Sequence, residues 1–435
     1  MHIYFSGIGG AGISSLALMA KQTGLDVSGS DKQDNHNLHY LRGKGIDNTH
    51  VGQTWDQIDE VHAKQPIDWL VYTSALPMEQ PDADELRFCK EKGIRATKRD
   101  EFLNYLLEQQ NLKMIAIAGT HGKTTTTAMA IWLFKQLGIP MSYSVAGNIN
   151  FGEAAHLEPD SHYFVYEADE FDHNFLAFHP TYSLITGIDW DHPDIYPTRE
   201  EYYQAFRDFL NQSEQAVLWD GDADRLSLDA SDDQIVLDDD DQQIEERLHL
   251  KGHVNRLNAW LVAHAVQKIT GKPLDELLPH LDKFPGVGRR FEQIAPRLIT
   301  DYAHTAPKIR GALQLAYETA GDDVVVVYEG LHNTRQHFMK DDLKHLFDGV
   351  KKLYIVPTYL AREDPNLALL KPENLKTLLD PLTQTRTEPA ALDSNLRSSI
   401  QKHLEAGDLV LCITAGGGNS LDQWLRQEFP RPEQR

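Results

Sequence analysis

Short apolar runs alternate with amphipathic segments along the whole chain. Each run is bounded by glycine or polar residues, which is typical of strands buried in a sheet. The predicted strands cover residues 2–5, 26–30, 69–72, 115–118, 163–166, 182–186, 298–300, 324–328, 353–356 and 409–413. Helices with apolar positions three or four residues apart are predicted through residues 16–20, 128–134, 202–209 and 255–263. This alternation indicates an α/β protein with parallel sheets.

Composition narrows the range of partners. The net charge of −23 argues against a surface for nucleic acid or anionic membranes, but a few local cations can still bind a nucleotide substrate. Cys89 and Cys412 are far apart and lie in no metal-binding pattern, which favours a reducing cytoplasm. The chain opens on a predicted strand without a leader pattern, and no apolar run is long enough to cross a membrane. The acidic run 238–241 is expected to be a solvated loop, because adjacent aspartates repel one another.

The strongest chemical signal follows the strand at 115–118. The sequence Gly-Thr-His-Gly-Lys-Thr-Thr occupies residues 119–125, and a helical pattern follows it. Backbone N–H groups at the start of such a helix face phosphates, Lys123 neutralises their charge, and a threonine hydroxyl binds magnesium. The usual pattern Gly-x-x-x-x-Gly-Lys-Ser/Thr would place its first glycine at Ile117, so the alternative is a plain glycine turn with Lys123 in solvent. A cation in the first turn of a helix opposes the helix dipole, which favours the anion site. Lys123 is expected to be a loop residue whose removal spares the fold.

A second glycine motif opens the chain. Gly-Ile-Gly-Gly-Ala-Gly at residues 7–12 follows the first strand, and the second strand ends at Asp31. This arrangement is typical of a dinucleotide-binding turn with an acid that reaches a ribose, and taken alone it suggests NAD. The other interpretation of Asp31 is a turn or capping residue. Acidic clusters at 167–170 and 189–194 follow two further strands, where open α/β sheets build their sites.

The motifs and the length of 435 residues predict three α/β domains. Residues 1–111 are expected to form a Rossmann-like domain, residues 112–284 a central P-loop ATPase-like domain, and residues 285–435 a second Rossmann-like domain. The Pro/Gly/Arg-rich segment around Gly286 is the predicted hinge.

The ordered set of motifs resembles the Mur ligase family over nearly the whole chain. The motifs that carry the resemblance lie at residues 7–12, 28–31, 118–125, 167–170, 191–192, 289–291 and 301–304. The resemblance implies an ATP-dependent ligase that joins an amino acid, with L-alanine favoured, to the carboxylate of UDP-N-acetylmuramate through an acyl phosphate. It places the protein in peptidoglycan precursor synthesis in the cytoplasm, with magnesium, as a monomer or weak homodimer. The glycine opening would then hold the uridine diphosphate and not NAD.

The resemblance also assigns site residues. Those implied for catalysis are Lys123, Glu167, His192 and Arg290, of which Glu167 and His192, with Thr124, would bind the metal. Those implied for ATP are Gly119, Thr120, Gly122, Lys123, Thr124, Thr125, Asn255, Asn258, Arg290 and Asp301. Those implied for the UDP-sugar are Gly7, Gly9, Gly10, Gly12, Ser30, Asp31, Ser74, Ala75 and His121. His304, His332 and Arg335 would bind the amino acid. Asp169 and Glu170 have two equally weighted interpretations: acids that hold metal-bound water, or N-terminal acids of the next helix. For His192, the alternative to the ligand role is a packing role.

Departures from the family pattern leave the amino acid open. Val254 stands where a histidine is usual, His332 stands where an arginine is usual, and the glycine run 416–418 ends in Asn419 and Ser420. One arginine with a histidine clamps a carboxylate less firmly than two arginines do. Glycine, serine or a recycled tripeptide are therefore alternatives to L-alanine. A nicotinamide dehydrogenase would leave the Lys123 loop without a role, and a non-catalytic partner would not need the full set of phosphate and metal residues.

Overall fold

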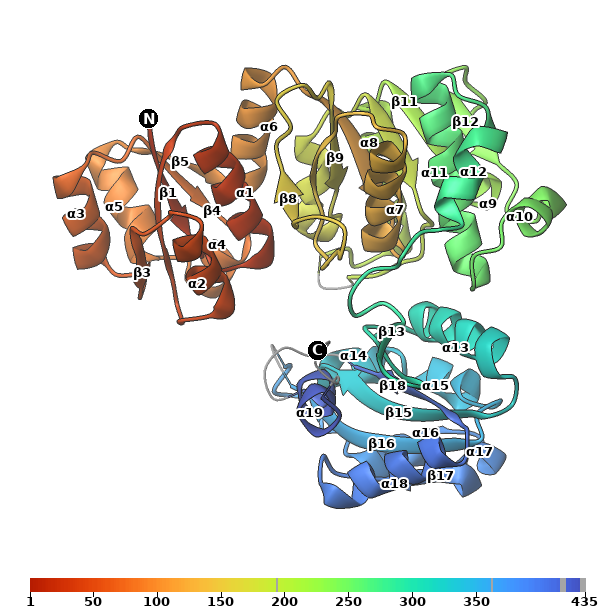
Figure 1. Cartoon of the computed structure of the whole chain (residues 1–435). Helices are drawn as coiled ribbons and strands as arrows, with labels where there is room; N and C mark the ends of the chain where they lie inside the picture. The colour runs from red at the N-terminus through yellow and green to blue at the C-terminus, as the bar shows by residue number, and fades with distance from the viewer. Residues whose placement is uncertain (193–194, 361–362, 415–419, 431–435) are drawn as a thin grey trace. The chain divides into compact units, whose positions relative to one another are not determined.

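The computed structural model describes residues 1–192, 195–360, 363–414 and 420–430. The chain divides into two compact units, one made of residues 1–241 and 258–281 and the other of residues 242–257 and 282–435. Within the described residues the chain forms three β-sheets, each flanked by helices (Figure 1). The predicted boundaries at 111/112 and 284/285 stay predictions.

The N-terminal sheet is parallel, with the order β3-β2-β1-β4-β5. Side chains alternate along β1, so that Ile3 and Phe5 enter one apolar cluster while Tyr4 enters another on the opposite face. Its strands are β1 (His2–Ser6), β2 (Asp26–Asp31), β3 (Thr49–Val51), β4 (Trp69–Tyr72) and β5 (Arg95–Lys98). Its helices are α1 (Ala11–Gln22), α2 (His36–Gly43), α3 (Trp55–Lys64), α4 (Ala75–Glu79), α5 (Asp84–Lys92) and α6 (Arg99–Gln109).

The central sheet has the order β12-β11-β10-β6-β9-β7-β8 and is parallel except for the pair β7–β8. One apolar cluster contains Phe5 and Phe102 of the N-terminal part together with Phe164 and Phe206 of the central part, so the two sheets share one unit. The strands are β6 (Lys113–Ala118), β7 (Ser142–Ser144), β8 (Ala155–His156), β9 (Tyr163–Glu167), β10 (Tyr182–Ile185), β11 (Gln215–Trp219) and β12 (Gln234–Leu237). The helices along this stretch of chain are α7 (Lys123–Gln136), the 3₁₀ segment η1 (Phe171–Ala177), α8 (Arg199–Asn211), α9 (Asp220–Leu226), α10 (Gln242–Arg247), α11 (His253–Thr270) and α12 (Leu274–Leu281).

The C-terminal sheet has the order β13-β14-β18-β15-β16-β17, with an antiparallel pair only at β13–β14. Every residue of its strand β15 is buried; Val324 and Val326 face one apolar cluster, and Val325 and Val327 face the other. The strands are β13 (Glu292–Ala295), β14 (Leu298–Asp301), β15 (Val324–Leu331), β16 (Lys352–Tyr359), β17 (Thr387–Pro389) and β18 (Leu409–Ile413). The helices are α13 (Ala306–Ala320), α14 (Asn333–Phe338), α15 (Lys340–Leu346), α16 (Pro372–Leu378), α17 (Pro381–Arg386), α18 (Ser394–Glu405) and α19 (Leu421–Glu428).

The α/β architecture predicted from the apolar pattern is confirmed. Each apolar run predicted as a strand lies in a strand, and each predicted helix lies in a helix. The strands missing from the prediction include short or polar ones, such as Arg95–Lys98 at the edge of the N-terminal sheet, but also the apolar, buried strand β11. No helix among the described residues is long and apolar enough to cross a membrane.

Candidate active site

The loop between β6 and α7 has the geometry of an anion site. Gly119 has φ +136°, and a Cβ there would overlap the Thr186 side chain, so this position requires glycine. Gly122 is the N-cap of α7 and has no side chain that could accept from the N–H groups of the first turn. The start of this helix therefore presents open backbone donors, which bind phosphate well.

Lys123 is the first residue of α7 and is largely buried, which corrects the expectation that it is a loop residue. Its ammonium donates to the Gly119 carbonyl at 2.7 Å and to Glu170 Oε2 at 2.5 Å. Exposed fractions of the two charged side chains are 14% for Lys123 and 1% for Glu170. Burial lowers the pKa of Lys123, but the carboxylates of Glu170, Asp169 and Glu167 outweigh it and raise that pKa. Lys123 is therefore a fixed cation beside the loop.

Two side chains with oxygen atoms that can bind a metal ion meet next to Lys123. Thr124 Oγ1 donates to Glu167 Oε1 at 2.9 Å, and Glu167 Oε2 accepts the Ala146 N–H at 3.2 Å. A hydroxyl and a carboxylate are the hard ligands that magnesium prefers, so this pair fits the predicted metal.

His192 stands among carboxylates at the same end of the sheet. Its Nε2 lies 3.8 Å from Glu170 Oε1 and 4.0 Å from Asp191 Oδ2, and its ring packs on Phe171 with centroids 5.1 Å apart. The backbone of His192 has φ +56°, a left-handed conformation that is uncommon for residues other than glycine. The contact with Phe171 agrees with the packing role, the ligand role of His192 stays a prediction, and the structure places His192 against Glu170.

The remaining loop residues are tied to the segment after β10. Thr120 Oγ1 donates to the Asp189 carbonyl at 2.6 Å and accepts the Asp189 N–H at 2.8 Å. His121 Nε2 lies 3.4 Å from Asp189 Oδ2, and its hydrogen bond lowers the pKa of Asp189. Asn258 also lies close to the loop, because a Cβ at Gly122 would come within 3.0 Å of its Oδ1. The loop is therefore held by the segment after β10, and Asn258 leaves little room for a side chain at Gly122.

The glycine opening contains a cation that its motif does not reveal. Asp31 Oδ2 accepts the Gly9 N–H at 2.9 Å, so Asp31 has the role of a turn residue that orders the opening. A Cβ at Gly12 would overlap the guanidinium of Arg99, which therefore lies at the start of α1. Burial lowers the pKa of Arg99, but Tyr166, Asp100 and Asp169 outweigh it and raise that pKa. Arg99 belongs to no motif, and no local sequence signal identifies it.

A turn after β9 contacts the N-terminal sheet. Asp172 and His173 both have left-handed backbones, with φ of 53° and 57°. Asp172 Oδ2 accepts from Lys98 Nζ at 2.5 Å, and Asn174 Oδ1 accepts from Ser74 Oγ at 3.0 Å. Ser74 is thus buried against the turn that follows the acidic segment 167–170.

In the second unit, one of the predicted ATP residues, Arg290, lies against an aromatic ring. Arg290 donates to the Tyr302 carbonyl at 3.2 Å, and its guanidinium lies 5.2 Å from the centre of the Tyr302 ring. Asp301 Oδ2 accepts the Phe291 N–H at 2.7 Å, and burial raises the pKa of Asp301 to about 6. Asn255 donates to the Lys251 carbonyl at 2.9 Å.

The predicted amino-acid residues lie in the same unit, and charged side chains stand near both histidines. Burial lowers the pKa of His304 far below its usual range, and Lys308, Arg335 and Arg290 add to this effect. Lys308 Nζ lies 3.4 Å from His304 Nε2. His332 Nδ1 lies 3.7 Å from Glu363 Oε1, so a carboxylate stands beside the expected carboxylate clamp. Residues 416–419, singled out in the sequence, lie outside the described residues, while Ser420 caps α19.

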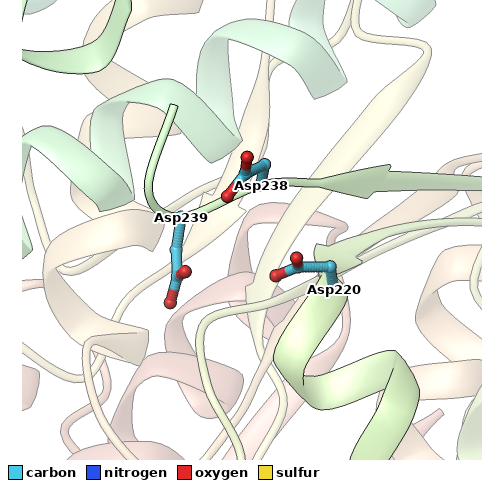
Figure 2. Close-up of side chains that lie close together, drawn as sticks. All are labelled: Asp220, Asp238 and Asp239. Carbon is cyan, nitrogen blue, oxygen red and sulfur yellow. The ribbon is translucent and has the colours of Figure 1, made fainter. Parts of the chain in front are cut away.

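The acidic run after β12 takes part in a separate cluster. Asp238 and Asp239 approach Asp220 at the start of α9, with carboxylate oxygens within 4.8 Å of one another (Figure 2). All three residues are exposed, as expected for a solvated loop. The expectation from the sequence rested only on the repulsion between adjacent aspartates and did not include Asp220. Asp220 joins this cluster because the neighbouring parallel strands β11 and β12 end at the same edge of the sheet.

Comparisons with known proteins relate the chain to one family of ligases. The family model "Mur ligase family, catalytic domain" matches residues 2–111, and "Mur ligase middle domain" matches residues 117–235. A UDP-N-acetylmuramate–L-alanine ligase from Gloeobacter violaceus is 30% identical, over 99% of this chain and 96% of its own length. One from Oleidesulfovibrio alaskensis is also 30% identical, over 95% and 96%. The solved UDP-N-acetylmuramate-alanine ligase from Thermotoga maritima has the same fold, with a TM-score of 0.73 at 24% identity and 98% coverage of both chains.

Proposed function

The chain belongs to the Mur ligase family, and we propose that it joins L-alanine to the carboxylate of UDP-N-acetylmuramate at the expense of ATP. This reaction is a step of peptidoglycan precursor synthesis. The observation that carries the reaction class is the meeting of Lys123, Thr124 and Glu167 at one end of the central sheet. The choice of substrates is supported by full-length similarity to ligases of that name.

The phosphate loop supports the first half-reaction. The muramyl carboxylate attacks the γ-phosphorus of ATP and ADP leaves, which gives an acyl phosphate. Such a transfer needs charge neutralisation and alignment more than covalent help from the protein. Lys123 and the open N–H groups of α7 would hold the phosphate oxygens. Magnesium, held by Thr124 and Glu167 with His192 nearby, would neutralise further phosphate charge.

The second half-reaction needs an amine close to the acyl phosphate. The amine of the amino acid attacks the carbonyl carbon, phosphate leaves, and the amine gives up a proton to form the amide. Arg335 and Lys308 are suited to the carboxylate of the amino acid, and His304 stays neutral among these cations. We assign Arg290 to the γ-phosphate, Asp301 to the ribose, and Asn255 and Asn258 to the adenine side.

We assign the glycine opening to the diphosphate of the sugar nucleotide. The start of α1 and the Arg99 guanidinium lie together there, which suits an anion. Ser30, Asp31, Ser74, Ala75 and His121 remain the proposed neighbours of this substrate. We propose that the protein is a monomer or weak homodimer, which light scattering of the purified chain measures directly.

One contact favours keeping other amines as alternatives to L-alanine. Glu363 stands beside His332, so the clamp differs in charge from a pair of arginines. Phosphate release from Mg-ATP and UDP-N-acetylmuramate, measured with L-alanine, glycine, serine and an L-alanine-led tripeptide, tests the assignment. Release that depends on L-alanine is the expected result. Release only with another amine would keep the chemistry and change the substrate, and a Lys123→Ala variant with near-normal release would refute the phosphate site.

A further inference from the structure

Glu170 is a buried carboxylate whose place in the reaction is not assigned by the phosphate-loop motif. It follows β9 and is 1% exposed, and its two oxygens face different partners. Oε2 lies 2.5 Å from Lys123 Nζ, and Oε1 lies 3.8 Å from His192 Nε2. The backbone carbonyl of Glu170 accepts from Tyr196 at 2.5 Å, which fixes the residue in position. Glu170 therefore lies between the cation for the phosphates and the histidine near the metal residues.

The nucleotide must compete with this ion pair. A phosphate oxygen that takes the Lys123 ammonium removes the partner of Glu170, and it brings more negative charge close to the buried carboxylate. A buried charge that loses its partner is strongly unfavourable. The imbalance is offset only when positive charge arrives together with the phosphates, as it does when the nucleotide binds with its metal ion.

We propose that Glu170 is the counter-charge of Lys123 in the nucleotide-free enzyme and that this pair makes ATP binding depend on magnesium. This inference rests on the proposed function, because it takes the Lys123 loop to be the ATP site. Before ATP binds, Glu170 holds Lys123 in its ionised form and in position. When Mg-ATP binds, Lys123 passes from the carboxylate to the phosphates, and the charge of the metal compensates Glu170. Metal-free ATP, which carries more negative charge, meets the full cost of separating the pair.

The test compares ATP binding with and without magnesium in Glu170→Gln and in the wild type. Isothermal titration calorimetry with ATP in excess EDTA, and again with magnesium, gives for each protein the factor by which the metal tightens binding. Glutamine keeps the shape of the side chain but removes its charge, so Lys123 becomes available to phosphate. We expect metal-free ATP to bind at least about fivefold more tightly to Glu170→Gln, the lower end of usual coupling between sites, and the magnesium factor to fall by the same ratio.

A matched control removes a neighbouring charge without touching Lys123. Asp172→Asn changes one carboxylate in the same segment, and asparagine tolerates the left-handed backbone there. Asp172 pairs with Lys98, so its variant should keep the wild-type magnesium factor. In Lys123→Met/Glu170→Gln, the gain in metal-free binding should vanish relative to Lys123→Met, because the cation that Glu170 masks is gone.

The outcomes separate this inference from the proposed function. An unchanged magnesium factor in a folded Glu170→Gln protein that still binds ATP would overturn the counter-charge role alone. Absence of ATP binding by the wild type under both conditions would overturn the proposed function and this inference with it. Should Glu170→Gln fail to fold, Glu170→Asp keeps the charge but withdraws it from Lys123, and it should raise metal-free affinity by a smaller factor; no rise in that variant would overturn the proposal.

Discussion

Lys123→Ala should destabilise the protein as well as stop turnover. The substitution leaves the Glu170 carboxylate buried without its main partner, 2.5 Å from where the ammonium was. Removing one partner of a buried pair typically costs about 3–5 kcal/mol. His192 Nε2 lies 3.8 Å from the other carboxylate oxygen, so the carboxylate keeps one polar neighbour. We therefore expect the lower end, about 3 kcal/mol in the free energy of unfolding.

The assay is thermal unfolding of the nucleotide-free protein, followed by circular dichroism. A loss of that size lowers the melting temperature by about 6–12 °C in a unit of this length. Lys135→Ala is the matched control, because Lys135 lies on the same helix but is exposed. A surface substitution of this kind changes stability by less than about 0.5 kcal/mol.

A second substitution shows whether the buried charge is the cause. In Lys123→Ala/Glu170→Gln a neutral amide replaces the carboxylate, so most of the lost stability should return, while turnover stays absent. A melting temperature for Lys123→Ala equal to that of Lys135→Ala would refute the reasoning. So would a double variant no more stable than Lys123→Ala, because the destabilisation would then come from lost packing and not from charge.

Three further predictions concern other parts of the chain. Gly12→Ala should displace the Arg99 guanidinium and raise the KM for the sugar nucleotide by about 10- to 150-fold, the worth of one hydrogen bond to a charged group; an unchanged KM would remove Arg99 from that site. Burial raises the pKa of Glu85 in the folded protein. The neutral carboxyl group therefore stabilises the fold fully below the unfolded pKa of about 4.3, and this stabilisation is lost as the pH rises through the folded pKa. Relative to Glu85→Gln, which does not titrate, the wild type should therefore lose stability to urea from pH 5 to pH 8, and parallel profiles would contradict the assignment. His332→Arg should lower the KM for the amino acid, and Glu363 should limit the decrease because it competes for the new guanidinium. An unchanged KM would place His332 outside the pocket.

The fold was most predictable where a long apolar strand is buried on both faces, although the buried strand β11 was missed. Residues 324–328 form a continuous apolar run because helices cover both sides of β15, and such a run identifies a strand without any tertiary information. β5 at a sheet edge reads Arg-Ala-Thr-Lys and carries no such signal. Its strand conformation depends on pairing with β4, which local sequence does not encode.

The site was predictable where its chemistry lies within one motif. Lys123 and Thr124 follow from the loop sequence, and Glu167 follows from its position at the end of a strand beside β6. Arg99 and Glu170 gain their roles from contacts across long stretches of chain, with Gly12 and Lys123 respectively. Asp31 shows the same limit, because its place at a strand end was correct but its carboxylate orders the glycine turn.

The segment after β9 explains how two anionic substrates can meet. Glu167 and Glu170 contact the phosphate loop, and a few residues later Asp172 and Asn174 contact Lys98 and Ser74 of the N-terminal part. The chain makes this passage through two successive left-handed residues, each of which costs about 1–3 kcal/mol and persists only where the surroundings enforce it. Transfer of a phosphoryl group requires the attacking carboxylate and the γ-phosphate to be held in line. One short, strained turn that contacts both the proposed ATP loop and the proposed sugar-nucleotide side supplies a rigid reference for both, and this is a physical reason for retaining the strain.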